Sequence, residues 1–336
     1  MTPTVTRHTS RSGLRIYTLP IEVFPRFWGN AYLLVGDGIA TLVDAGSGLG
    51  GSDEHLLAGF ARVQDEWGER ITPAELRRII ITHGHIDHFG GLTALRQHTD
   101  APITMHTIDR RILTNYEGTR LVTSKALSLF LGRAGVEAAE HTRLMHMYGW
   151  SKNAFHSLVV EHVVEDGDRI DDLLDVIHAP GHCPGQICLR VDEVLLSADH
   201  ILARTSPHLA PETITLGTGL EHYRRALRNV AKLDGIELTL AGHEDPITDV
   251  YGRIEGLFAS HDRKLTRILD WLRDEPRTIA QLSAAMYQKL DGYDVLLALQ
   301  EVGAHVEYLY LRGHIRPANV DPADNEILAA LVYEVF

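Results

Sequence analysis

The chain of 336 residues contains little of what marks secreted, membrane-spanning or nucleic-acid-binding proteins. Its two cysteines, Cys183 and Cys188, are too few for a disulfide scaffold and fit a reducing cytoplasm. No apolar run approaches the ~18 residues that a membrane span needs, and the N-terminal segment lacks the apolar core of a signal peptide. The net charge of −13 disfavours nucleic acid as the main partner. We therefore expect a cytoplasmic protein that contacts no membrane.

What the chain has in excess is histidine, with 20 residues against only 8 phenylalanines. The hydrophobic share of 44% and the charged share of 23% are ordinary for a globular protein, so extensive disorder is not expected. At this length we expect two domains, or one large domain with an appendage. A histidine excess indicates metal binding only where the residues stand at ligand spacing, so their positions decide the matter.

Short apolar runs broken by glycines predict a series of β-strands with a few helices between them. Helices are expected at 52–67, with Ser52 or Asp53 as the N-cap, and at 221–233. The strands are expected at 14–19, 31–36, 39–46, 77–85, 103–106, 157–164, 175–182, 187–191, 193–200 and 237–245.

Two further segments are helical in pattern. One is 108–157, and the other is the tail from about residue 255, which contains three predicted helices. Thr278 with Gln281 forms a candidate capping box for the second of these helices, and Gly313 ends the third. Three helices followed by a short end resemble a winged-helix module.

The strongest chemical signal is the motif T-H-G-H-I-D-H at 82–88, which follows a predicted strand and carries His83, His85, Asp87 and His88. Imidazole nitrogens and a carboxylate are ligands suited to zinc and similar ions. Further candidates stand at other strand ends: His182, Asp199 and His243. A single loop histidine is more often a surface or hydrogen-bonding residue, but the set in this order favours a metal site.

With these residues the sequence resembles the metallo-β-lactamase superfamily over nearly the whole chain. Besides H-x-H-x-D-H, the matching motifs are V-D-A-G at 43–46, P-G-H at 180–182, Asp199, and G-H at 242–243. The stretches 197–210 and 261–315 are similar to the hydrolase branch with a C-terminal winged helix. That branch contains the lactamase-like endoribonucleases, glyoxalase-II-like proteins and metallo-lactamase-type thioesterases.

The resemblance implies an α+β fold, an αββα sandwich with its site at one edge where strand-end loops converge. It also implies a division of the chain into two domains. The catalytic domain would span 1–255, with a helical cap insertion at about 108–157. A winged-helix-like helical domain would span 256–336.

The resemblance further implies two metal sites. His83, His85 and His182 would hold the first ion, Asp87, His88 and His243 the second, and Asp199 would bridge them. All seven donors are nitrogen or oxygen, so zinc is expected first, with manganese or iron as alternatives. Asp44 would orient a ligand or loop, although a plain strand-end turn residue is an equal interpretation.

The implied reaction is hydrolysis, in which a metal-bridging hydroxide attacks an ester, thioester or phosphodiester centre. Asp87 is the expected catalytic residue, which would orient the nucleophile and move its proton. Three residues differ from those typical of other branches of the superfamily, which disfavours the activities of those branches. His85 replaces the glutamate of the flavodiiron branch, Asp199 is a carboxylate that true β-lactamases lack, and Leu202 replaces the tyrosine of acyl-homoserine lactonases.

Apolar side chains in the insertion and in the loop before the second strand predict the substrate class. The candidate lining residues are Tyr116, Met147, Trp150, Phe27 and Trp28. For most of them individually, packing of the extra helices is the plainer interpretation. An apolar cleft favours a small-molecule ester, thioester or lactone with an acyl or aromatic part.

Other interpretations stay open. An endoribonuclease or phosphodiesterase of the same fold is one alternative, and it would need a basic surface to bind nucleic acid. The segment 261–320 holds eight basic and eight acidic residues, so it does not offer such a surface. A non-catalytic metal-binding regulator would have no need of the full ligand set. G-S-G-L-G-G at 46–51 formally fits a dinucleotide motif, which alone is weak. The tail is expected to serve packing or dimerisation, so a homodimer is a further alternative.

Overall fold

The computed structural model describes residues 3–36, 38–152, 154–320 and 330–336, without the side chains of residues 150–152. Contacts within the chain divide it into two compact units, each built from three segments. Unit 1 contains Met1–Tyr116, His156–Pro207 and Ala226–Ile254. Unit 2 contains Glu117–Phe155, His208–Arg225 and Glu255–Phe336.

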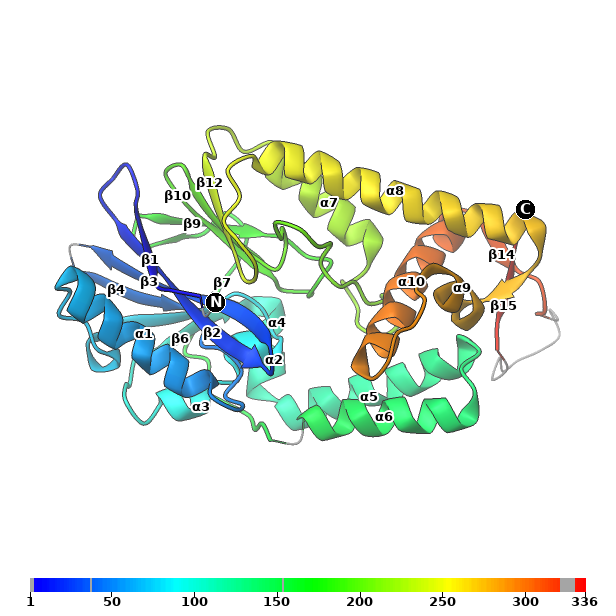
Figure 1. Cartoon of the computed structure of the whole chain (residues 1–336), viewed down its shortest axis with the longest axis horizontal. Coiled ribbons are helices and arrows are strands. Elements are labelled where there is room, and N and C mark those ends of the chain that lie inside the picture. Colours follow the sequence, from blue (N-terminus) through cyan, green and yellow to red (C-terminus); the bar gives the residue numbers. More distant parts are fainter. Residues whose placement is uncertain (1–2, 37, 153, 321–329) are drawn as a thin grey trace. The chain divides into compact units, whose positions relative to one another are not determined.

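Unit 1 is built on two β-sheets (Figure 1). Within the described residues the first sheet has seven strands in chain order, antiparallel from β1 to β4 and parallel from β4 to β7. Its strands are β1 (Thr6–Thr9), β2 (Arg15–Phe24), β3 (Phe27–Gly36), β4 (Ile39–Val43), β5 (Arg78–Ile81), β6 (Ile103–His106) and β7 (His162–Val164). The segment predicted as a strand at 157–164 is therefore shorter, because only its end pairs with β6.

The second sheet has the strand order β12-β11-β10-β9-β8. Its strands are β8 (Arg169–Ile170), β9 (Leu174–His178), β10 (Ile187–Val191), β11 (Val194–Ala198) and β12 (Leu238–Ala241). Only the β11–β12 pair is parallel among these described strands. The carboxyl ends of β11 and β12 therefore lie at the same edge of the sheet.

Side chains of both sheets meet in one apolar core. Ile16, Leu34 and Ile80 of the first sheet share a cluster with Leu189 and Leu196 of the second, and each is at most 1% exposed. Burial of this apolar surface stabilises the face-to-face packing of the two sheets. The predicted α+β sandwich is confirmed.

Helix α1 (Ser52–Trp67) packs on β2 of the first sheet, as Figure 1 shows. A Cβ at Gly59 would lie 3.3 Å from the Leu19 side chain, so the helix and the strand approach closely. The predicted limits of this helix are confirmed, but the predicted N-cap is wrong. Gly51 occupies the cap position, because the Ser52 hydroxyl instead accepts hydrogen bonds from the backbone N–H groups of Ser47 and Gly48.

Shorter helices follow the strands of unit 1. They are α2 (Ile86–Phe89), α3 (Leu92–Leu95) and α4 (Thr107–Thr114). Two longer helices, α7 (Leu220–Val230) and α8 (Val250–Asp274), have residues in both units. No helix in the described part of the chain is long and apolar enough to cross a bilayer.

Unit 2 joins the predicted insertion to the tail. Its remaining elements are α5 (Tyr116–Arg133), α6 (Ala138–Lys152), β13 (Arg277–Thr278), α9 (Ile279–Met286), α10 (Tyr293–Leu311), β14 (Ile315–Pro317) and β15 (Val332–Val335). The Thr278–Gln281 capping box is present at α9, and Gly313 follows α10 with φ 69°. The strands form a small sheet in the order β13-β15-β14. A winged-helix identity for this part stays a prediction.

The insertion packs on the tail through specific contacts. The Ala134 carbonyl accepts a hydrogen bond from the Ala280 N–H, and a Cβ at Gly303 would lie 2.7 Å from the Phe130 ring. The contact-based units therefore differ from the predicted domain limits of 1–255 and 256–336. The sequence predicts a cap at about 108–157 within the first domain, whereas the contacts group Glu117–Phe155 with the C-terminal helices.

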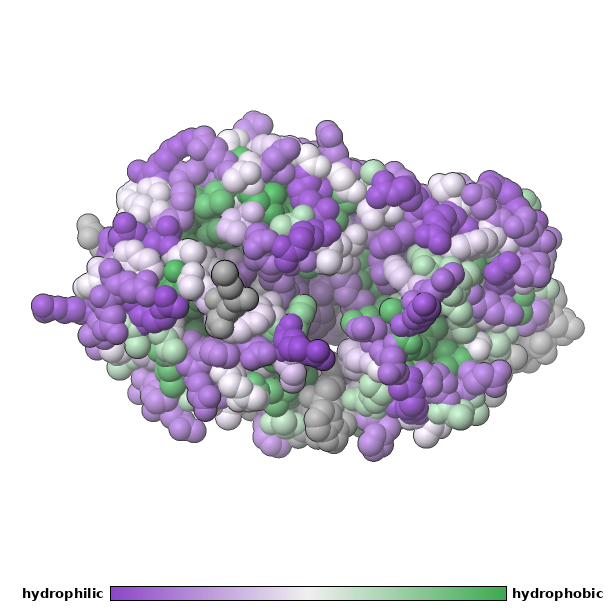
Figure 2. Space-filling model, in the orientation of Figure 1, coloured by the Kyte–Doolittle hydropathy of each residue, from purple (hydrophilic) through white to green (hydrophobic). Residues whose placement is uncertain are grey.

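Large apolar side chains also reach the surface. Examples are Leu121 and Val122 of α5 and Leu216, which are 58%, 69% and 74% exposed. On the face shown in Figure 2, green residues form small patches among purple ones. Scattered surface apolar residues of this kind are usual in globular proteins.

Candidate metal centre

The predicted ligands all follow strands. The loop after β5 carries His83 and His85, and α2, which follows at once, carries Asp87 and His88. The others follow β9, β11 and β12 and are His182, Asp199 and His243. Because the ends of β5, β11 and β12 lie at one edge of the sandwich, these loops can converge there.

The structure brings all seven predicted ligands together. Potential donor atoms lie within 4.8 Å of one another in three overlapping groups. These groups are His83, His85 and His182; His83, His88 and Asp199; and Asp87, His88 and His243. We refer to the first group as the three-histidine cluster and to the third as the Asp87 cluster.

Asp199 lies between the two clusters. Its Oδ2 atom is 3.6 Å from His182 Nε2 and 3.4 Å from His243 Nε2, and its Oδ1 atom is 3.5 Å from His88 Nε2. Two ligands that bind one tetrahedral zinc ion at about 2.1 Å are separated by about 3.4 Å. The spacing around Asp199 therefore matches the spacing between ligands of a shared ion.

Several of the converging atoms are buried without a hydrogen bond. Among the described residues these include Nε2 of His83, Nε2 of His88 and Oδ1 of Asp199. A buried polar atom without a partner costs free energy, so native proteins rarely leave several of them side by side. A divalent cation would satisfy all three atoms, and the residues present therefore fit a metal ion.

The two carboxylates give the centre a strong preference for positive charge. Although burial acts in the opposite direction, Asp199 and Asp87 raise the pKa of His243 to about 10. Burial also opposes ionisation of Asp87, yet His88 and His243 hold the pKa of its carboxyl well below the usual range. Burial and neighbouring histidines lower the pKa of His83, which keeps it a neutral imidazole suited to metal binding.

Asp44 orients two of the imidazoles. Its carboxylate accepts hydrogen bonds from the Thr82 N–H, the Thr82 hydroxyl and His88 Nδ1–H, each at 2.8 Å. The Thr82 hydroxyl in turn lies 3.1 Å from His83 Nδ1. Because Nδ1 of His88 donates to Asp44, the lone pair of its Nε2 is left to point at the centre.

His243 is oriented by β3. Its Nδ1 atom donates to the Trp28 carbonyl at 2.8 Å, and the Asn30 N–H donates to the Gly242 carbonyl at 2.7 Å. A Cβ at Gly242 would lie 2.2 Å from Asp199 Oδ1 and 2.9 Å from His88 Cε1. Only glycine therefore fits before His243, because two other predicted ligands occupy the adjacent space.

Comparison with known proteins agrees with this geometry. A model of the metallo-β-lactamase superfamily matches residues 26–243, well over half of the chain. The chain belongs to this superfamily.

Among curated relatives, the probable metallo-hydrolase YqjP of Bacillus subtilis is 23% identical over 291 residues, which cover 83% of this chain and 86% of that one. The acyl-coenzyme A thioesterase MBLAC2 of Gallus gallus is 30% identical over 181 residues, covering 51% of this chain and 56% of that one. The chain is thus similar to metallo-hydrolases, and its family membership shows a metal-dependent hydrolase.

Solved structures show the same fold. The metallo-β-lactamase family protein TTHA1429 of Thermus thermophilus has a TM-score of 0.76 and 25% identity, covering 96% of this chain and 98% of that one. A β-lactamase domain protein of Burkholderia ambifaria has a TM-score of 0.71 and 22% identity, covering 98% and 93%. Because both alignments span nearly the whole chain, the architecture of both units recurs in other members of the superfamily.

The glycine loop at 46–51 has a packing role in this superfamily member. Its Ser47 and Gly48 N–H groups bind the Ser52 hydroxyl, and a Cβ at Gly48 would lie 2.6 Å from the Gly90 carbonyl oxygen. The loop thus packs closely on the backbone that follows the H-x-H-x-D-H motif. Close contacts account for Gly46 and Gly48, and a positive φ of 58° accounts for Gly50, so these glycines need no dinucleotide-binding role.

The predicted substrate residues fall into different environments. Phe27 is 47% exposed, and its ring centroid lies 4.6 Å from that of His243. Trp28 is half-buried, with its ring 5.1 Å from that of His55. Phe27 thus lies directly beside a predicted ligand, with Trp28 next to it.

The predicted residues of the insertion are placed differently. Tyr116 is only 4% exposed and packs against Phe89 of α2, so its ring is part of the interior. Met147 is half-buried in unit 2, where its sulfur lies 3.7 Å from an Arg143 nitrogen. The side chain of Trp150 lies outside the described residues. Of the three, Tyr116 is placed by burial where a substrate would not reach it.

Sequence reasoning missed several residues that support the loops. Thr82 links Asp44 to His83, Asn30 holds the loop before His243, and Asp109 of α4 binds two other loops. Thr82 stands inside the motif and could have been noticed there. Asp109 carries no local signal, because the groups that it binds are far away in the sequence.

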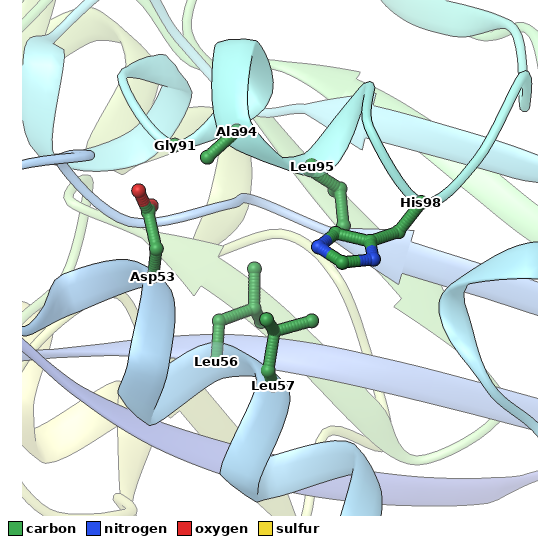
Figure 3. A pocket seen from close by; sticks show the side chains of 7 residues that line it. All are labelled: Asp53, Leu56, Leu57, Gly91, Ala94, Leu95 and His98. Carbon is green, nitrogen blue, oxygen red and sulfur yellow. The ribbon is translucent and has the colours of Figure 1, made fainter.

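A small cavity lies apart from the metal centre. It measures about 20 Å³ and is lined by residues of α1 and α3 together with Gly91 and His98. Figure 3 shows Asp53 on one side of it and Ala94 and Leu95 on the other. Because it has room for about one water molecule and contains none of the predicted ligands, it carries no substrate-binding role.

Proposed function

We propose that this chain is a binuclear metal-dependent hydrolase that acts on a small-molecule ester, thioester or lactone. The observation that carries the proposal is the convergence of seven nitrogen and oxygen donors with the spacing of ligands around shared ions. The three-histidine cluster would hold one ion and the Asp87 cluster the other, with Asp199 between them. Zinc is the first candidate, and manganese and iron suit the same donors.

Bound divalent ions would lower the pKa of a water molecule and polarise the carbonyl oxygen of the substrate. The chain's own residues position these events. Asp87 is partly exposed and its Oδ2 atom lies 3.3 Å from His243 Nε2, so it can orient a water molecule and accept its proton. Asp44 and the Trp28 carbonyl fix the imidazoles of His88 and His243, which keeps the site preorganised.

An apolar acyl or aromatic substrate is supported by the surroundings of His243. Phe27 offers half-exposed aromatic surface there, and Phe24 stacks on it with ring centroids 6.4 Å apart. The named activity of the thioesterase relatives agrees with acyl hydrolysis. We also propose a cytoplasmic location and a homodimer, and the two buried cysteines, which form no disulfide, fit a reducing compartment.

The reaction class is tested by a substrate screen. The chain, loaded with zinc or manganese, is assayed on p-nitrophenyl esters, thioesters, lactones and phosphodiesters. We expect turnover of the acyl substrates and a reduction of both metal content and activity in His85→Ala, because His85 belongs to the three-histidine cluster. A His85→Ala protein with full metal content and full turnover would overturn the proposal. Turnover of phosphodiesters alone would favour the nuclease alternative, and metal binding without any turnover would favour a regulator.

The role of Phe27 is tested by Phe27→Ala. Because its ring lies against His243 and is half exposed, we expect KM for long-chain acyl substrates to rise about tenfold, with metal content and melting temperature unchanged. Phe336→Ala removes another exposed phenylalanine, in unit 2, and serves as the control. An unchanged KM for every acyl length in Phe27→Ala would remove Phe27 from the substrate site.

A further inference from the structure

Asp109 is a buried acidic residue that the catalytic proposal does not use. It lies in α4, is 0% exposed, and follows His106 at the end of β6 by three residues. Both of its carboxylate oxygens are engaged. Oδ2 accepts a hydrogen bond from the Gly84 N–H at 2.9 Å, and Oδ1 accepts one from the Gly185 N–H at 2.7 Å.

The two amides belong to the two loops of the three-histidine cluster. Gly84 stands between His83 and His85, and Gly185 stands three residues after His182. A third hydrogen bond reaches the Asp109 carboxylate from Cys183, which is adjacent to His182. One carboxylate therefore connects the loop that carries two of the histidines to the loop that carries the third.

Helix α4 packs so closely on both loops that neither Gly84 nor Gly185 has room for a side chain. A Cβ at Gly185 would lie 2.7–2.8 Å from the backbone nitrogen, Cβ and Cγ of Asp109. A Cβ at Gly84 would lie 2.3 Å from the Ile112 side chain, one turn further along α4. The glycines thus permit the approach of the helix, and the carboxylate then fixes the separation of the loops.

The other cluster is held by hydrogen bonds that do not involve Asp109, although Asp44 also reaches His83 through Thr82. Asp44 holds His88, and the Trp28 carbonyl holds His243, each by a hydrogen bond of 2.8 Å. The hydrogen bonds of the Asp109 carboxylate go instead to the loops of the three-histidine cluster. A change at Asp109 is therefore expected to disturb one metal site and to leave the other in place.

We propose that Asp109 is a positioning residue that holds the two loops of the three-histidine cluster at metal-binding separation, so that it determines the affinity of this cluster for its ion. The inference rests on the proposed binuclear centre and deepens it, because it assigns to the three-histidine cluster a support of its own, in addition to the link from Asp44 through Thr82 to His83. Residues that orient metal ligands from behind typically change metal affinity by about 10–100-fold when replaced.

The test is a zinc titration of the full chain against a chromophoric chelator, which resolves two successive dissociation constants. In Asp109→Asn an amide NH₂ faces one of the two backbone N–H groups, so one hydrogen bond is lost with little change in shape. We expect one constant to weaken about 10–100-fold and the other to stay unchanged. Asp192→Asn, which also removes a carboxylate that accepts a backbone N–H but lies at the β10–β11 turn, is the matched control.

A second comparison assigns the weakened site. His85→Ala removes a ligand of the three-histidine cluster, so the zinc that this variant still binds belongs to the Asp87 cluster. Adding Asp109→Asn to His85→Ala should leave the dissociation constant of that remaining zinc unchanged. In cobalt-loaded protein, the visible bands of one site should change in Asp109→Asn and those of the other should not. Gly185→Ala, which places a methyl group against Asp109, should show the same selective loss from the opposite side.

Equal weakening of both constants would overturn the proposal, as would unchanged constants with only a lower melting temperature. That second result would show a purely structural role for Asp109. The titration needs no substrate, so failure of the proposed ester hydrolysis would appear in the activity screen alone. Failure of the Asp109 inference would appear in the metal affinities alone.

Discussion

At the scale of single residues, Asp44 shows how the backbone supports the site. It has φ 61°, a left-handed conformation that is uncommon outside glycine, and three hydrogen-bond donors converge on its carboxylate. In this conformation the Asp44 carboxylate lies between Thr82 and His88. The sequence left a turn role and an orienting role equally open, and the geometry supports the orienting role.

Asp44→Asn should keep the backbone and lose one of these three acceptor interactions, because asparagine tolerates the left-handed region but presents an NH₂ group. We expect metal affinity and turnover to fall about 10–100-fold. Metal titration and steady-state kinetics measure both. Asp171→Asn is the control, since Asp171 also has a positive φ, 53°, but pairs with Arg78 at the surface. Equal metal affinity in Asp44→Asn and the parent chain would contradict the orienting role.

The ligands could be predicted from the sequence because each follows an apolar strand, and four of them share one short motif. The residues that hold these ligands in place could not be predicted from the sequence. The two glycines that Asp109 binds lie 25 and 76 residues from it in the chain. Tyr116 is 4% exposed, and its burial could not be predicted because an aromatic residue in a helical segment has the same local pattern whether it packs inside or lines a cleft.

At the scale of elements, glycines bring the loop at 46–51 and the turn after α2 into contact. A Cβ at Gly90 would lie 2.1 Å from the Ser47 carbonyl oxygen, and one at Gly91 would lie 2.1 Å from that of Ala45. Backbone atoms cannot move aside as a flexible side chain can. The position of α2, and with it that of Asp87 and His88, therefore depends on these glycines.

Gly91→Ala should lower the free energy of unfolding by about 2–4 kcal/mol, since the methyl group would overlap a backbone oxygen. Gly256→Ala in α8, where no atom of the described residues lies within 4 Å of the added Cβ, should instead raise it by about 0.5–1 kcal/mol. Urea unfolding of the two variants provides the comparison. A stabilised Gly91→Ala protein would show that the two loops are free to separate.

Within unit 2, helix α10 and the part of α8 that belongs to this unit meet through a buried histidine pair. Nδ1 of His261 lies 3.0 Å from Nε2 of His305, whose Nδ1 donates to the Glu301 carbonyl at 2.7 Å. Burial, together with the other imidazole and the nearby Lys264 and Arg224, lowers the pKa of His261 to about 2. Burial also lowers the pKa of His305 to about 4, against the opposing influence of Glu301.

Because both values lie below the unfolded value of 6.5, the pair is neutral in the folded state and takes up protons on unfolding in mild acid. Stability contributed by the pair is present above about pH 6.5 and is lost as the pH falls towards about 4, at ~1.4 kcal/mol per pH unit for each histidine. The free energy of unfolding at several pH values, in the parent chain and in His305→Gln, measures this slope. We expect a shallower slope in His305→Gln, whereas the exposed His146→Gln should keep the parent slope. Parallel profiles for all three proteins would contradict the prediction.

The longer strands of the two large sheets were predicted because apolar runs bounded by glycines have few alternatives in a sandwich, whereas the short strands β1 and β8 and those of the small sheet were missed. The segment on which the insertion packs was not predicted. Helix α5 exposes Leu121 and Val122 while Leu127 and Leu131 are buried, so its apolar residues do not mark a single face. Without such a face, the sequence could indicate helices but not the contacts through Phe130 and Ala134 that join them to the tail.

At the scale of the whole molecule, the chemistry belongs to unit 1 and the histidine pair to unit 2. Metal removal should therefore act on unit 1. A ligand that binds only the folded state stabilises it by ~4 kcal/mol when present at about 1,000 times its dissociation constant. We expect a chelator to abolish hydrolysis and to lower the melting temperature, with recovery of both on adding zinc. A melting temperature that the chelator leaves unchanged would contradict tight metal binding.

The most direct test of the binuclear centre is the metal-to-protein ratio of the full chain, purified without chelator and loaded with zinc, beside that of Asp199→Ala. Because Asp199 lies between the two clusters, we expect about two ions per parent chain and weakened binding of both in the variant. A parent chain that binds no transition-metal ion under any loading condition would contradict the account, as would an Asp199→Ala chain that retains both ions with unchanged affinity.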